Sequence, residues 1–83
     1  MSDSHLSRHE KQLIDWLRQA LASGEAQARR KAAGLSIPAV VRLAQAPEKG
    51  TFIHWESGVR TPAYTPTAVR AARAYQSLPE VTS

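Results

Sequence analysis

Cysteine is absent from this chain of 83 residues. Its absence excludes disulfides, thiolate metal sites and cysteine nucleophiles, and it fits a reducing, cytoplasmic setting. No segment approaches the roughly 18 uninterrupted apolar residues that a membrane span needs, and the first residues lack the apolar run of a secretory leader. We therefore expect a cytoplasmic protein that is neither exported nor embedded in a membrane.

Patterns that indicate catalysis or metal binding are also missing. No spacing of serine, histidine and aspartate suggests a nucleophile with its base, and there is no glycine-rich phosphate loop or pair of carboxylates. His5 and His9 are four residues apart, a spacing that could hold a metal from one helix, but no further ligand accompanies them. We expect no enzyme activity, no metal, no cofactor and no small-molecule ligand.

Acidic side chains are fewer than basic ones, at seven against 11, which gives a net charge of +4. Residues 1–24 carry three side chains of each sign, whereas residues 25–83 carry eight basic and four acidic ones. The basic excess therefore lies in the later part of the chain. Such an excess is typical of phosphate binding, although many mildly basic proteins bind no nucleic acid.

Apolar residues recur at spacings of three and four, and no alternating run is long enough to indicate a strand. Helix caps divide the pattern: Ser7 with Glu10 forms a capping box, Gly24 and Gly58 end helices, and Thr65 with Pro66 begins the last one. We predict a compact all-α domain of five helices, over residues 7–21, 25–33, 36–46, 51–56 and 65–78.

The apolar stripes predict which side chains form the core. Only alanine can be buried on the second helix, and Gly50 is expected to supply unusual backbone freedom in the turn of residues 47–50. The expected core residues are Leu13, Trp16, Leu17, Ala20, Leu21, Val40, Val41, Leu43, Ala44, Phe52, Trp55, Val59, Val69, Ala72 and Tyr75.

Three segments carry a family resemblance: "ARRKAAGLS", "VVRLA" and "FIHWESGVRTP". Over residues 25–78 the chain resembles the XRE-type helix-turn-helix regulators, which include Cro-like and phage-repressor-like proteins. The resemblance implies a lambda-repressor-like fold in which a recognition helix ends before Gly58. It also implies a sequence-specific, double-stranded-DNA-binding transcription regulator of phage or mobile-element type, expected to be a repressor that binds an inverted-repeat operator as a homodimer.

The resemblance also assigns roles to individual residues. Glu56 would brace the domain internally, and the recognition helix would contact bases in the major groove. The implied base-contacting residues are Lys49, Gly50, Thr51, Ile53 and His54, and the candidates for contacts to phosphate are Arg29, Arg30, Lys31, Arg42 and Arg60.

Two departures from the family pattern favour an alternative. Ile37 and Pro38 stand where the family has a polar residue, and the turn at residues 47–50 is one residue longer. A protein-interaction module, such as an antitoxin or anti-repressor on a helix-turn-helix scaffold, therefore remains open. Residues 1–24 would form a tail and an amphipathic helix that either completes the core or makes a dimer interface; residues 25–78 would be the DNA-binding domain and 79–83 a tail.

Overall fold

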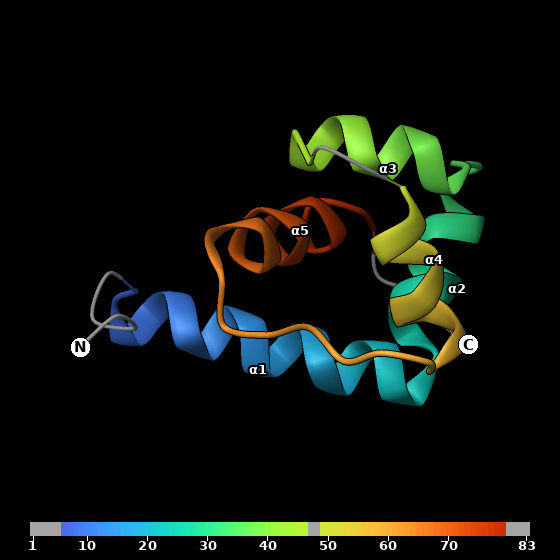
Figure 1. Cartoon of the computed structure of the whole chain (residues 1–83). Coiled ribbons are helices and arrows are strands. Elements are labelled where there is room, and N and C mark those ends of the chain that lie inside the picture. The colour runs from blue at the N-terminus through green and yellow to red at the C-terminus, as the bar shows by residue number, and fades with distance from the viewer. Residues whose placement is uncertain (1–5, 47–48, 80–83) are drawn as a thin grey trace.

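The computed structural model describes residues 6–46 and 49–79. Within these ranges the chain forms five α-helices and no strand (Figure 1): α1 (Arg8–Ser23), α2 (Glu25–Ala32), α3 (Ile37–Ala44), α4 (Gly50–Ser57) and α5 (Pro66–Gln76). The prediction of an all-helical domain with five helices is confirmed. None of the helices in the described ranges is both long and apolar enough to cross a membrane.

Local capping chemistry sets the helix ends. Ser7 and Glu10 form a reciprocal capping box, in which the Glu10 carboxylate accepts from the Ser7 amide at 2.8 Å and the Ser7 hydroxyl accepts from the Glu10 amide at 3.1 Å. Gly24 and Gly58 end α1 and α4 in the left-handed region, at φ values of 86° and 84°. These caps confirm the predicted starts and stops.

Helix α5 lies at the centre of the molecule, between α1 and α3 (Figure 1). Its buried residues include four alanines, Ala68, Ala71, Ala72 and Ala74, so the neighbouring helices approach closely. The apolar stripe of α1 is covered within the chain, because Leu13, Ile14, Leu17 and Ala20 are all buried and α1 packs on both α5 and α2. Of the two predicted roles for this stripe, the structure supports completion of the core.

Three sequence predictions about packing are wrong. Leu43 is 54% exposed, because Val40, Val41 and Ala44 define the buried arc of α3 and Leu43 lies about 100° around the helix from its centre. Val59 is 70% exposed, because it follows the left-handed Gly58 and the helical period stops there. Gly50 is not among the glycines with positive φ; it is simply the first residue of α4.

Trp16 and Leu21 are only partly buried against the core, whereas the predicted core residues other than these two, Leu43 and Val59 are buried. Pro47 and Glu48, which complete the predicted turn before α4, lie outside the described residues.

Candidate functional site

Helix α4 is held to the core by two aromatic rings on one face. Phe52 is fully buried and Trp55 nearly so, their ring centroids are 4.9 Å apart, and Phe52 also lies 6.3 Å from the ring of Tyr75 on α5. Because residues 52 and 55 share a face, Ile53 and His54 between them face solvent, as does Lys49 at the N-cap. The residues predicted to contact bases thus gather along α4, although Gly50 and Thr51 are half-buried.

A buried ion pair fixes the last turn of α4. The Glu56 side chain is 4% exposed and accepts hydrogen bonds from Nε and Nη2 of Arg30 at 2.9 and 2.8 Å. It also accepts from the Tyr75 hydroxyl at 2.6 Å. These three side chains connect α2, α4 and α5, which confirms the prediction that Glu56 braces the domain internally.

The ion pair perturbs the groups that contact it. The hydrogen bond to Glu56 raises the pKa of Arg30, which keeps the guanidinium charged. Burial raises the pKa of the Tyr75 hydroxyl well above its usual range, and the hydrogen bond and the charge of Glu56 add to this effect.

The free energy of unfolding is expected to fall as the pH rises past about 10, because the pKa of Tyr75 is raised in the folded protein. The unfolded chain releases this proton near pH ~10, whereas the folded protein retains it, so each further pH unit costs about 1.4 kcal/mol. The contribution of Tyr75 is complete below that pH and is lost above it. Urea unfolding of the parent and of Tyr75→Phe at about pH 8 and about pH 11 measures it; equal alkaline losses in both proteins would refute this origin.

Arg29 and Arg30 are buried, at 6% and 9% exposure, which corrects the prediction that they face phosphates. Arg29 pairs with Glu25 at 2.7 Å, donates to the carbonyl of Leu78 and lies over the ring of Trp16. Arg30 donates to the carbonyl of Leu35 in addition to Glu56. Because both guanidinium groups are used inside the molecule, the expectation that only alanine is buried on α2 is also wrong.

The other predicted cations remain on the surface: Lys31, Arg42, Lys49 and Arg60 are all exposed. Arg73 on α5 is exposed as well, although sequence reasoning gave it no role. Among the described residues after Lys31, the one acidic side chain is the buried Glu56, and the exposed carboxylates lie on α1 or at the start of α2. The surface of α3, α4 and α5 is therefore cationic, which favours anionic partners.

The loop from Gly58 to Thr65 carries Arg60 and is fixed at both ends. The amide of Arg60 donates to the carbonyl of His54 at 3.2 Å. Further along, Pro62 is buried, the Tyr64 hydroxyl donates to Asp15 on α1, and the guanidinium of Arg18 lies 5.3 Å from the centre of the Tyr64 ring. Figure 1 shows the loop running alongside α1. No sequence pattern predicted these contacts.

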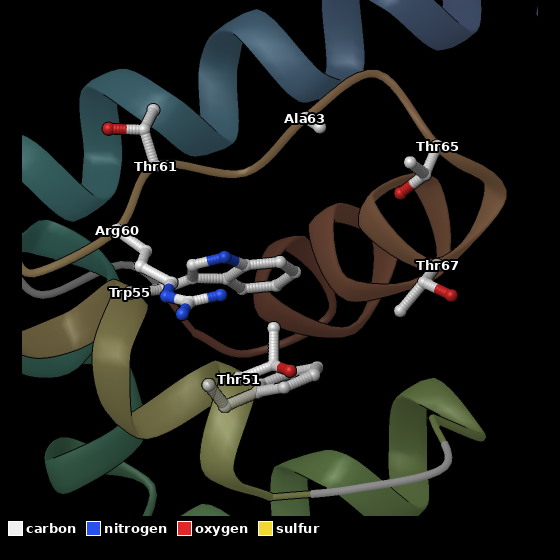
Figure 2. A pocket seen from close by; sticks show the side chains of 8 residues that line it. Thr51, Trp55, Arg60, Thr61, Ala63, Thr65 and Thr67 are labelled. Carbon is white, nitrogen blue, oxygen red and sulfur yellow. The ribbon is translucent and has the colours of Figure 1, made fainter.

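A pocket of about 370 Å³ opens between α4, this loop and the start of α5. Figure 2 shows Trp55 near its centre, with Arg60 and Thr61 on the loop side and Thr51 on the α4 side. Thr65 and Thr67, from the first turn of α5, complete one wall. The sequence did not reveal this pocket, because its walls come from three segments that meet only in the folded chain.

Metal binding has no further support from the described part of the chain, where no three histidine, aspartate or glutamate side chains cluster. His5, one of the two histidines considered above, lies outside the described residues.

Comparisons of this chain with models of protein families, with curated proteins and with solved structures find no match.

Proposed function

We propose that this protein is a sequence-specific, double-stranded-DNA-binding transcription regulator of the XRE type, in which α3 and α4 form the helix-turn-helix. The proposal rests on how α4 is buried and on the charge of the surface around it. One face of α4 is buried by two aromatic rings, its opposite face is exposed, and no exposed carboxylate of the described residues lies on α3, α4 or α5.

The dimensions and chemistry of α4 support this role. Eight residues make a helix about 12 Å long, which is close to the width of the major groove of B-DNA. Lys49 can donate to guanine O6 or N7, His54 can donate or accept, and Ile53, which is 43% exposed, can pack on a thymine methyl group.

Fewer residues remain candidates for contacts to the DNA backbone than the sequence predicted. Lys31, Arg42 and Arg60 remain candidates because they are exposed, whereas Arg29 and Arg30 are left out for the burial described above. Ile37 is half-buried against the core at the start of α3, so its side chain supplies no phosphate contact there.

We further propose that the protein represses transcription as a homodimer on an inverted-repeat operator, with half-sites about one helical turn apart. Since α1 buries its apolar face within the chain, the dimer contact would come from another surface.

Selection of bound duplexes from a random pool, followed by affinity measurements at several salt concentrations, tests the proposal. The double variant Lys49→Ala, His54→Ala is expected to lose about 1–3 kcal/mol of discrimination per base contact, since these side chains would read base edges. Arg42→Gln should weaken binding to all sequences alike and reduce the salt slope by about one.

Two results would refute this assignment. One is full operator preference in the double variant at Lys49 and His54. The other is a parent protein that binds no duplex even at low salt. Sedimentation that finds one protomer per operator at saturation would remove the dimer.

A protein-interaction module is the second candidate, and it is favoured by the exposure of two large apolar side chains, Ile53 and Leu43. Exposed apolar groups on adjacent helices suit a protein surface better than a polyanion. A defined partner that binds with one-to-one stoichiometry and little dependence on salt, combined with the absence of duplex binding, would favour this role over DNA recognition.

A further inference from the structure

The pocket beside α4 is lined by hydrogen-bond donors and by no acidic side chain. Its floor is apolar, because Phe52 and Trp55 form it, and its rim carries Arg60 and several threonines. The guanidinium of Arg60 has no acceptor among the residues that the structure describes, although the loop that carries it is held to α1 and α4. A positive charge is therefore available at the mouth of the pocket.

Trp55 adds a donor from inside the pocket. Its side chain is 6% exposed, and its indole N–H bonds to no acceptor within residues 6–46 and 49–79. Figure 2 shows the ring nitrogen on the edge that faces the loop of Thr61 and Ala63. Among the described residues no buried side-chain nitrogen lacks a partner, so this N–H is reached by solvent and can donate to an acceptor that enters from outside.

The threonine hydroxyls at the start of α5 can also donate hydrogen bonds. Thr65 Oγ1 accepts from the amide of Ala68 at 3.2 Å, and Thr67 Oγ1 accepts from Arg70 at 3.4 Å. A hydroxyl oxygen that accepts still carries a hydrogen to donate, so both groups can donate to a ligand. The guanidinium of Arg60 and the indole of Trp55 therefore lie on the loop side of the pocket, and Figure 2 shows Thr65 and Thr67 across the Trp55 ring from Arg60.

We propose that this pocket binds a small organic oxyanion, a carboxylate or phosphate ester attached to one planar ring. The acid group lies by Arg60 and the indole N–H of Trp55, and the ring lies on the apolar floor toward Thr65 and Thr67. The volume, about 370 Å³, is at the small end of ligand pockets, which suits a single ring with its acid group. Such a ligand goes beyond the proposed function and differs from the expectation of no small-molecule ligand.

Occupancy of the pocket would reach the proposed DNA-contacting residues of α4, because Thr51 is one of them and lines the pocket. A ligand there would lower duplex affinity, because its acid group would occupy Arg60, which is also a candidate for a backbone contact. The proposed ligand and the DNA backbone both carry an oxyanion, so the test must distinguish binding of a free ligand from binding of a backbone phosphate.

Titration with phenyl phosphate and with benzoate, followed by the ¹⁵N–¹H signals of the two tryptophan indoles in the absence of DNA, tests the proposal. We expect a saturable shift of the Trp55 signal and none of the Trp16 signal, because Trp16 lines no part of the pocket. A Trp16→Phe variant assigns the signals. Benzyl alcohol, which has the ring but no charge, should bind at least tenfold more weakly.

Variants of residues in and outside the pocket test whether the ligand binds there. Arg60→Gln should weaken phenyl phosphate binding at least tenfold, while the protein keeps the parent unfolding midpoint. Arg73→Gln is the matched control, since it removes an exposed charge outside the pocket, and it should leave binding unchanged.

The proposal is overturned if neither acid shifts the Trp55 signal at millimolar concentration, if benzyl alcohol binds as well as benzoate, or if Arg60→Gln has no effect. It is also overturned if only a short duplex shifts the signal, because the pocket would then hold a backbone phosphate. Failure of duplex binding alone would refute the proposed function and leave this site standing.

Discussion

Replacing Glu56 with glutamine is expected to lower the free energy of unfolding by about 3–5 kcal/mol. The substitution keeps the size of the side chain but removes the charge that neutralises Arg30, whose side chain is 11% exposed, so solvent replaces little of the lost interaction. For a domain whose total stability is about 5–15 kcal/mol, this is a large part of the whole. Urea unfolding followed by circular dichroism measures it.

Glu25→Gln is the matched control for this substitution. It removes the carboxylate from the other arginine pair of α2, but the side chain of Glu25 is 44% exposed, so solvent screens the interaction. We expect a loss of about 0–1 kcal/mol. Comparable losses in the two variants would mean that the pair of Arg30 and Glu56 is solvated in the folded protein.

The second large effect is expected from Leu17→Ala in α1, at about 2–5 kcal/mol of destabilisation. Leu17 is fully buried on α1, which packs on α5 and α2, and removing its branched end leaves a cavity that the adjacent helices cannot fill without shifting. The midpoint of thermal or urea unfolding gives the loss, and it should not depend on protein concentration, because the contact lies within one chain.

Leu43→Ala provides the comparison, since Leu43 has the same side chain but is 54% exposed on α3. Its cost should stay within about 0.5 kcal/mol. If Leu17→Ala were no more costly than Leu43→Ala, or if its cost varied with protein concentration, α1 would belong to an interface between chains and not to the core.

The fold could be predicted where its determinants are local. Ser7 with Glu10, Gly24 and Gly58 each act within a turn of helix, so the sequence shows them directly, and the five helices follow. Val59 was misplaced because the helical period stops at Gly58. Leu43 was misplaced because helical period alone does not say where the buried arc of a helix ends. That boundary is set by the width of the neighbouring helix, which is a property of the packed chain.

The candidate site was predicted less completely, because its key contacts join distant segments. Glu56 was assigned an internal role, but its partners Arg30 and Tyr75 are 26 and 19 residues away, and nothing in their spacing identifies them. Burial of Arg29 had one local signal, the Glu25 four residues earlier. The pair of Tyr64 and Asp15, 49 residues apart, had none.

The bond from Tyr64 to Asp15 has a consequence for any shortened form of the protein. A fragment that begins at Gly24 would keep the whole family-like segment, yet it would lose the surface on which the Tyr64 ring rests. The backbone around Arg60 would then sample many geometries, and restricting them on association would cost conformational entropy. Helix α1 therefore holds the cationic loop that carries Arg60 in one conformation before a partner binds, although the loop is not part of α1.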